Sequence, residues 1–387
     1  MKIAIHATPL VTRQVTGIEQ QARNIVGQWT QLASNSLFFL LLENHLPYLR
    51  DYDSSFIDAL PENFQIVGIH PERRFSTMER IEGLLSPNTP RPGRREPWEV
   101  LHSFSAWLPR WSSVPMVHTI HDLSCELDPR VRRTHEAAKQ RAIHRSAVQR
   151  ASHTIAVSRQ TRDDIIALYG IPPERVDVIH NGINPTFTAE TDAAIHARLV
   201  AEFQTDRPYI LLVGSDIPRR NYQRVWRAME RVLDDHRRIQ VIFTGRNQWN
   251  QTAIYHQIGA SKYMDRVKFI ESPTDPVLAQ LYRDALLTCC GSSFEGFGLS
   301  VLEAMACGCA VACSDMMSLR ELAGDAALYF SHDETPSMAD AMNSLVDDPE
   351  FRRQLRQKGL QRSTQFTWEH SARALLTILE NTVTAMR

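Results

Sequence analysis

The sequence predicts an α/β protein of two domains, each built around a doubly wound parallel sheet. Its 387 residues are enough to form two separate hydrophobic cores. Short apolar runs alternate with longer helical patterns, and this alternation pauses and then restarts near residue 209. The runs YILLVG at 209–214 and ALLTCCG at 285–291 are apolar almost throughout, which is typical of strands buried on both faces of a parallel sheet.

We expect residues 1–185 to form the first domain. Thr16 and Glu19 fit a capping box at the start of its first long helix, and Ser158 is expected to cap a later one. The predicted strands are 2–6, 37–42, 64–69, 100–104, 116–120, 153–157 and 176–180, and the predicted helices are 16–32, 130–150 and 159–169.

The second domain is expected over residues 186–367. Residues 182–208 carry turn residues and no clear strand, so we interpret them as a linker. The predicted strands are 209–213, 240–244, 267–270, 286–290, 310–313 and 327–330, and the predicted helices are 222–233, 276–285, 299–307, 336–347, 349–365 and 368–386.

Composition excludes several classes of protein. The formal net charge is −1 and the pI is about 7.0, so no nucleic-acid partner is expected. Five of the six Cys residues lie within 289–313 and lack the usual zinc spacing, so buried free thiols and a reducing compartment are expected. The start MKIAIHATPL is too short an apolar run for a signal peptide, and no stretch is long enough to span a bilayer. We therefore expect a cytoplasmic protein.

Residues 71–99 form the irregular part of the first domain, where arginines are interleaved with apolar side chains. One interpretation is a solvated loop with a short helix. The other is a surface that contacts an anionic lipid or a lipid-linked acceptor, on the cytoplasmic face of the inner membrane. The residues concerned are Arg73, Arg74, Arg80, Arg91, Arg94 and Arg95, with Phe75, Met78, Ile81, Leu84, Leu85 and Trp98.

The stretch SSFEGFGLSVLEAMACG at 292–308 has the pattern of a strand exit, a glycine-rich turn and a helix. Gly296, Phe297 and Gly298 form the turn, and the helix starts near Leu299. Glycines let backbone N–H groups approach a ligand closely, and a helix N-terminus favours a phosphate. The alternative is an ordinary turn into an amphipathic helix, without a ligand.

Two carboxylates flank this turn. Glu295 lies at its mouth, and Glu303 lies about one turn into the helix. Carboxylates beside bound sugars accept hydrogen bonds from vicinal hydroxyls, so Glu303 could hold a ribose and Glu295 could contact a hexose. The spacing alone is weak evidence, because chance could supply a pair of Glu residues eight positions apart.

The longer run SSFEGFGLSVLEAMACGCAV resembles the E-x7-E signature of the retaining GT-B glycosyltransferases of family 4. Ser300 and Ala310 stand where that family commonly has proline. The resemblance implies two Rossmann-like domains that face a cleft, with a nucleotide sugar bound to the second domain. It also implies that backbone groups of Gly298 and Leu299 contact the donor diphosphate.

The run LLVGSDIPRRNYQRVWRA at 211–228 resembles the family segment that binds the donor diphosphate. Gly214 is its first glycine, and Arg219 and Arg220 are its basic residues by position. Many relatives have Arg directly after the glycine, where this chain has Ser215, and Lys where it has Arg220. Without the resemblance, the two arginines could equally be a solvated helix start.

The run VHTIHDLSCELDP at 117–129 resembles a family segment of the first domain. By this resemblance His121 faces the cleft near the donor sugar, and Asp122 orients the imidazole or caps the following turn. Gly17 is either an ordinary helix-start glycine or a point of close approach to the donor phosphate or the acceptor. The resemblance also implies that Trp368 starts a C-terminal helix, about 368–387, that packs back on the first domain.

The activity implied is transfer of a hexose, with retention, from a nucleotide sugar to a hydroxyl of a lipid-linked glycan. Such enzymes build bacterial O-antigen and exopolysaccharide, and mannose or rhamnose from a GDP-sugar is our best hypothesis. The resemblance also allows for other glycosyltransferases as partners. The expected catalytic residues are Glu295, His121, Arg219 and Arg220. No DxD-type metal motif appears in a loop after a predicted strand, so we expect no metal and no other cofactor.

Two other classes remain open. One is another GT-B enzyme, such as an epimerase or a phosphorylase, although none of the five Lys residues lies in an evident pyridoxal phosphate pocket. The other is a non-catalytic subunit that binds a sugar nucleotide. The presence of both Glu295 and Glu303 argues against a non-catalytic subunit.

Overall fold

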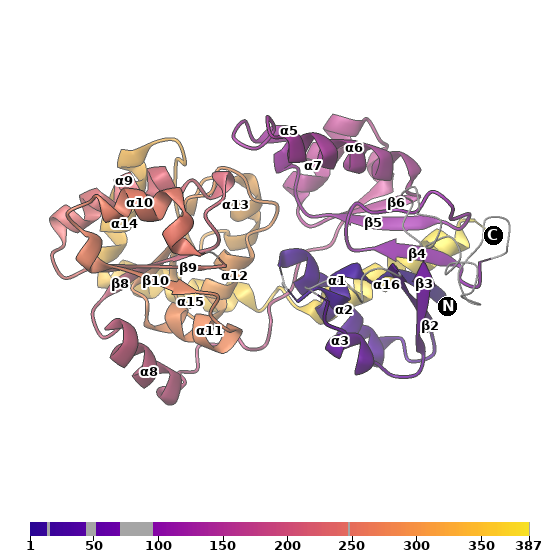
Figure 1. Ribbon diagram of the computed structural model, residues 1–387, viewed down its shortest axis with the longest axis horizontal. Helices are drawn as coiled ribbons and strands as arrows, with labels where there is room; N and C mark the ends of the chain where they lie inside the picture. The colour runs from indigo at the N-terminus through magenta and orange to yellow at the C-terminus, as the bar shows by residue number, and fades with distance from the viewer. Residues whose placement is uncertain (14–15, 44–51, 70–95, 247, 387) are drawn as a thin grey trace. The chain divides into compact units, whose positions relative to one another are not determined.

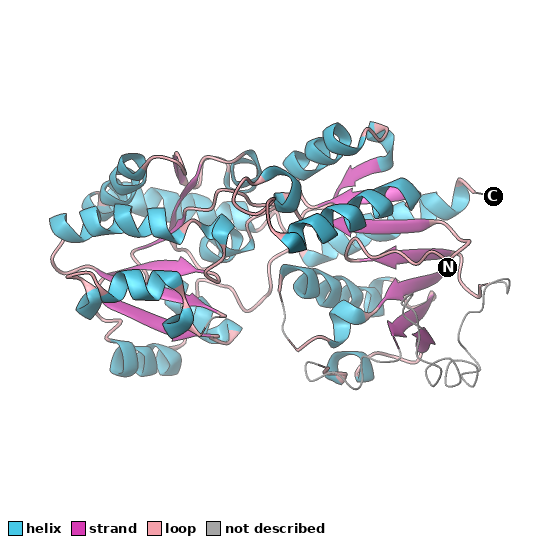
Figure 2. Ribbon diagram, turned by 45° about the horizontal axis from the view of Figure 1, so that its top comes forward, coloured by secondary structure: helices cyan, strands magenta, loops and turns pink. Residues whose placement is uncertain are grey.

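The computed structural model describes residues 1–13, 16–43, 52–69, 96–246 and 248–386. Contacts within it divide the chain into two compact units (Figure 1). The first unit comprises residues 1–123, 138–182 and 368–387, and the second comprises 124–137 and 183–367. Each unit holds one parallel sheet with helices on both faces (Figure 2), which confirms the predicted fold class.

The sheet of the first unit has seven strands in the order β3-β2-β1-β4-β5-β6-β7. The chain starts in the middle at β1 and winds outward first one way and then the other, so β1 and β4 flank a topological switch point. The strands are β1 Lys2–His6, β2 Leu37–Glu43, β3 Phe64–Ile69, β4 Val100–Ser103, β5 Met116–Ile120, β6 His153–Ala156 and β7 Val176–Val178.

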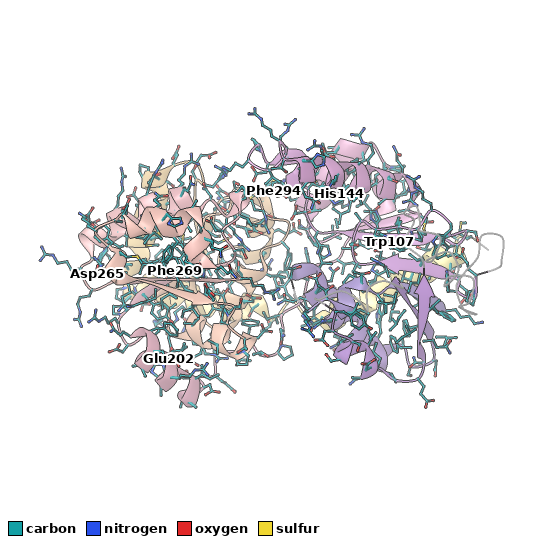
Figure 3. The ribbon with its side chains drawn as sticks, viewed as in Figure 1. Trp107, His144, Glu202, Asp265, Phe269 and Phe294 are labelled. Atoms are coloured by element: carbon teal, nitrogen blue, oxygen red, sulfur yellow. The ribbon has the colours of Figure 1, made fainter. Side chains whose placement is uncertain are left out.

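Alternate residues of these strands feed separate cores on the two faces of the sheet. Ile3 and Ile5 of β1 pack with α2 and α16, whereas Ala4 packs on the opposite face near α6. In Figure 3, Trp107 lies in this unit, where its ring stacks on that of His6 at 4.0 Å. The helices of the unit are α1 Thr8–Val11, α2 Gly17–Leu32, α3 Ser55–Asp58, α6 His135–Arg150, α7 Arg159–Tyr169 and α16 Trp368–Thr384.

Side chains cap the long helices where the sequence predicted them to. The backbone N–H of Thr16 donates to Glu19 at 2.7 Å, which completes the capping box of α2. The hydroxyl of Ser158 accepts from the backbone N–H of Thr161 at 3.1 Å and starts α7. α16 packs along α2, where the Trp29 indole donates to the Ala372 carbonyl at 3.0 Å.

The sheet of the second unit has six strands in the order β10-β9-β8-β11-β12-β13. Helices α9, α10 and α14 cover one face, and α8, α11 and α15 lie on the other (Figure 1). The strands are β8 Tyr209–Val213, β9 Gln240–Gly245, β10 Val267–Glu271, β11 Leu287–Cys290, β12 Ala310–Ser314 and β13 Leu328–Phe330. The helices are α5 Ser124–Leu127, α8 Ala193–Phe203, α9 Tyr222–Asp235, α10 Ala253–Gly259, α11 Asp275–Asp284, α12 Leu299–Ala306, α13 Met317–Ala323, α14 Thr335–Asp347 and α15 Pro349–Ser363.

The segment that we interpreted as a linker, 182–208, contains the helix α8. Its N-cap is Asp192, whose side chain accepts hydrogen bonds from the backbone N–H groups of Ala194 and Ile195, both at 3.0 Å. The helix also packs against α11. The turn residues on either side of α8 obscured its helical pattern. The N-cap aspartate was the sequence signal that could have indicated a helix.

Two further expectations differ from the structure. The helix expected from residue 130 begins at His135, where the Thr134 hydroxyl accepts the Ala137 N–H at 3.1 Å. Residues 124–137 group with the second unit instead of the first, and their ties to it include the hydrogen bond that Asp128 accepts from Ser293 at 2.8 Å. The predicted boundary of the first domain was therefore wrong for this segment.

The possible membrane surface at 71–99 falls mostly outside the described residues. In the part of the chain that is described, no helix combines the length and the hydropathy required to cross a bilayer. All six cysteines are buried and none forms a disulfide, which confirms the prediction of buried thiols for the five within 289–313.

Candidate functional site

Two loops of the second unit meet at the carboxyl ends of neighbouring strands. β8 leads through Gly214 to the short 3-10 helix Pro218–Arg220, and β11 leads to the glycine-rich turn. Since β8 and β11 pair in parallel, their loops leave the same edge of the sheet. The Ser293 N–H donates to the Arg219 carbonyl at 2.8 Å and joins the two loops.

Glu295 lies at the centre of this junction, and both of its carboxylate oxygens are paired. Arg219 Nη1 lies 2.8 Å from Oε2, and Arg220 Nη1 lies 2.9 Å from Oε1. The hydroxyl of Ser292 also donates to Oε1 at 2.8 Å. Arg219 donates in addition to the carbonyl of Phe294 at 3.3 Å. The structure thus brings together three residues that the sequence predicted to act at one site.

The charges of this cluster do not cancel. Burial works to raise the pKa of Glu295, but the Arg219 and Arg220 guanidiniums outweigh it and hold that pKa below its usual value. The pKa of Arg220 is raised, because the attraction of Glu295 outweighs its own burial. One ionised carboxylate therefore faces two cations, and the positive charge left over favours an anionic ligand.

Gly214 makes room for the side chain of Arg220. Its φ is +127°, and a Cβ placed on it would lie 2.8 Å from Arg220 Nε. The Tyr222 hydroxyl donates to the Gly214 carbonyl at 2.9 Å and fixes the turn. A larger residue at this position would displace the guanidinium from Glu295.

The helix α12 begins directly after the turn. Gly298 is its N-cap with φ +103°, and its carbonyl accepts the Val301 N–H at 2.9 Å. The Ser318 hydroxyl of α13 holds the turn by donating to the Glu295 carbonyl at 2.7 Å. By helix geometry the first N–H groups of α12, at Leu299 and Ser300, have no acceptor within the helix. This end of α12 is therefore suited to a phosphate.

Glu303 lies on the second turn of α12 in a different environment. Burial first, and the nearby charge of Asp275 second, raise its pKa to about 8. The hydroxyl of Tyr282 donates to Oε2 at 3.3 Å. Glu303 is thus mostly protonated at neutral pH, whereas Glu295 is ionised.

Gly298→Ala should disrupt the start of α12. The added Cβ would lie 2.5 Å from Leu319 Cδ2, and alanine rarely adopts a φ of +103°. We expect a cost of about 1–3 kcal/mol, or several degrees in the midpoint of thermal unfolding. Gly27→Ala in α2 is the control, because its Cβ would meet nothing within 4 Å. An unchanged midpoint for Gly298→Ala would contradict this account of the turn.

The remaining predicted site residues lie in the first unit. The His121 ring donates from Nε2 to the carbonyl of Phe104 at 2.8 Å, and burial lowers its pKa, so the imidazole is neutral with Nδ1 as an acceptor. Gly17 opens α2 next to its N-cap Thr16. The predicted roles of His121 and Gly17 towards a donor stay predictions.

Several residues at the site were not predicted. Ser292 could have been found, since it precedes Glu295 by three positions within the motif. Nothing in the sequence singled out Tyr282, Ser318 or Asp128, which reach the site from other elements. Among the described residues, no group of three His, Cys, Asp or Glu side chains is placed to bind a metal ion.

Comparison with known families agrees with this geometry. A model described as "Glycosyl transferases group 1" matches residues 197–362, which contain the whole cluster around Glu295. This part of the chain is therefore similar to the glycosyl transferases of group 1. A second model of this kind, "Glycosyltransferase Family 4", matches residues 55–187.

Curated glycosyltransferases are similar to parts of the chain. An O-antigen chain mannosyltransferase B of Escherichia coli is 26% identical over 54% of this chain and 55% of its own length. A D-inositol 3-phosphate glycosyltransferase of Nocardia farcinica is 27% identical over 70% of this chain and 62% of its own. The matches thus span less than two thirds of these relatives.

Solved GT-B structures share the fold over the whole chain. Sucrose-phosphate synthase from Thermosynechococcus elongatus superposes with a TM-score of 0.74 at 18% identity, covering 100% of both chains. WaaG, a glycosyltransferase involved in lipopolysaccharide biosynthesis, gives 0.70 at 14% identity, covering 98% of this chain and 99% of its own. The Anabaena protein HepE, solved with UDP-glucose, gives 0.73 at 18% identity, covering 98% of this chain and 100% of its own.

Proposed function

We propose that this protein is a retaining glycosyltransferase that uses a nucleotide sugar. The observation that carries the proposal is the cluster of Arg219, Arg220 and Glu295 beside the start of α12. Two guanidiniums and free helix N–H groups are what a diphosphate requires, and one carboxylate holds both guanidiniums in place.

In the proposed reaction the bond between the anomeric carbon and the diphosphate oxygen breaks. The acceptor hydroxyl oxygen forms the new bond on the same face of the sugar, and its proton passes to the departing phosphate oxygen. Negative charge accumulates on the diphosphate, where Arg219, Arg220 and the N–H of Leu299 stabilise it. Glu303 holds the ribose, and Glu295 acts as a positioning residue near the hexose. No metal is required in this scheme, because the arginines supply the counter-charge.

For the donor we propose a GDP-sugar that carries mannose or rhamnose. The similarity to an O-antigen chain mannosyltransferase supports this choice, whereas the fold neighbour HepE was solved with UDP-glucose and supports UDP as the rival. For the acceptor we propose a hydroxyl of a lipid-linked glycan in bacterial surface polysaccharide synthesis. With such an acceptor the enzyme would act at the cytoplasmic face of the inner membrane, with other glycosyltransferases as partners.

A thermal-shift screen with GDP, UDP, dTDP and ADP tests the donor. A nucleotide that binds the native state at one hundred times its Kd stabilises it by about 2.7 kcal/mol, so the preferred base should raise the melting midpoint by a few degrees. We expect GDP to give the largest shift. A larger shift with UDP would overturn the choice of base, and no shift with any of the four would overturn the nucleotide site.

A further inference from the structure

A second charged recess lies in the same unit, at the other end of α12. It is a pocket of about 390 Å³ between the residues that follow α12, Cys307 and Gly308, and the first turns of α15. α12 has eight residues and is therefore about 12 Å long, so the pocket is separate from the site at Gly298. Its volume suits a small molecule.

The lining of this pocket carries positive charge only. Four arginines face it, and no Asp or Glu lines it. Thr191 and Gln357 add a hydroxyl and an amide, which also donate hydrogen bonds. The four arginines are Arg283 of α11 and Arg352, Arg353 and Arg356 of α15.

Backbone carbonyls hold three of these arginines without neutralising them. Arg283 donates to the carbonyl of Thr188 at 2.6 Å, and Arg352 donates to that of Val346 at 3.1 Å. Arg356 donates to the carbonyl of Gly308. Only Arg353 has an ion-pair partner among the described residues, the exposed Glu350 at 2.6 Å. The guanidiniums are thus fixed in position while their charge remains available.

The proximity of these charges is unfavourable as long as the pocket holds no anion. Burial first, and the charge of Arg356 second, lower the pKa of Arg352, although Asp348 works in the opposite direction. The N-terminus of the fifteen-residue helix α15 adds its partial positive charge, since Pro349 at its first position lines the pocket. An anion with several oxygens would relieve this repulsion.

We propose that this pocket binds the phosphate group of a phosphorylated molecule, at a site distinct from the donor site. Planar guanidiniums bind phosphate oxygens in pairs, so four of them match a phosphate or a diphosphate better than a single carboxylate. The assignment does not depend on the proposed transferase activity, because no residue of the Glu295 cluster takes part.

Isothermal titration with inorganic pyrophosphate tests the site at constant ionic strength. Because pyrophosphate also suits the donor site, the titrations use protein that carries Arg220→Gln. We expect binding to persist in this background and to weaken about ten-fold or more when Arg352→Gln and Arg356→Gln are added. Arg353→Glu gives a second test, since its exposed side chain can be reversed in charge without disturbing the fold.

Arg362→Gln is the matched control. Arg362 lies on α15 and donates to the carbonyls of Leu322 and Glu321, at 2.8 and 2.7 Å, but it does not line the pocket. The proposal requires this variant to bind pyrophosphate normally. An equal loss in Arg362→Gln, no loss with Arg353→Glu, or no binding at all in the Arg220→Gln background would overturn it.

A vesicle sedimentation experiment shows whether the bound phosphate belongs to a lipid headgroup or to a soluble molecule. Phosphatidylcholine vesicles with and without phosphatidic acid are sedimented with the same proteins. Sedimentation that requires phosphatidic acid together with Arg352 and Arg356 would assign a lipid headgroup. Pyrophosphate binding without such sedimentation would assign a soluble phosphorylated molecule, which we expect from the recessed position of the arginines.

Discussion

Arg220→Ala should lower the turnover of the nucleotide sugar about 100- to 1000-fold, which is typical of removing one group that stabilises developing charge. The side chain lies 2.9 Å from Glu295 and against Gly214, so its loss removes a cation from the diphosphate position. Arg219 and Ser292 still hold Glu295, and the protein should therefore remain folded. Hydrolysis of the donor without an acceptor measures the effect.

Two matched variants separate this role from a general loss of charge. Arg220→Lys keeps a cation and should recover much of the rate, since many members of the family that 211–228 resembles have lysine at this position. Arg224→Gln removes an arginine of the next helical turn that pairs with Asp333 at 2.7 Å, and it should leave hydrolysis unchanged. Full activity of Arg220→Ala in a folded protein would remove Arg220 from the site.

Donor affinity should increase with pH, because the ionised carboxylate of Glu303 accepts stronger hydrogen bonds from ribose hydroxyls than its protonated form does. With a pKa of about 8 in the free protein, the carboxylate is scarce at pH 6.5 and abundant at pH 8.5. The dissociation constant of the preferred nucleotide should fall about ten-fold or more over this interval. Calorimetric titration at several pH values measures it.

Glu303→Gln is the control for this pH dependence. It keeps the shape of the side chain but cannot ionise, so its affinity should stay low and flat over the same interval. A pH-dependent affinity of equal slope in Glu303→Gln would assign the titration to another group. Equal donor hydrolysis by the wild type and by Glu303→Ala would contradict the proposed donor site as a whole.

The raised pKa of Glu303 also makes the stability of the folded protein depend on pH. The folded protein keeps this proton up to about pH 8, whereas an unfolded chain loses it near 4.5. The contribution to stability is complete below pH 4.5 and is lost as pH rises through 8. Thermal unfolding of Glu303→Gln should lack this decline.

The elements that the sequence predicted best were those with strong local signals. The capping box of α2, the N-cap of α7 and the apolar strands of both sheets lie where expected, because alternation and caps depend on residues a few positions apart. The prediction missed α8, whose pattern was masked by surrounding turn residues, and it misplaced 124–137. The contacts that tie that segment to the second unit are long-range, such as the bond from Ser293 to Asp128, 165 positions away.

Local sequence patterns were enough to predict the fold class, the strand–turn–helix at 292–308 and the arginine pair at 219–220. The pairing of both arginines with Glu295 is a property of the three-dimensional arrangement, and so are the raised pKa of Glu303 and the lowered pKa of Glu295. Spacing cannot reveal this difference. The two carboxylates differ through burial and through the charges that other elements place beside them, and these act across space and not along the chain.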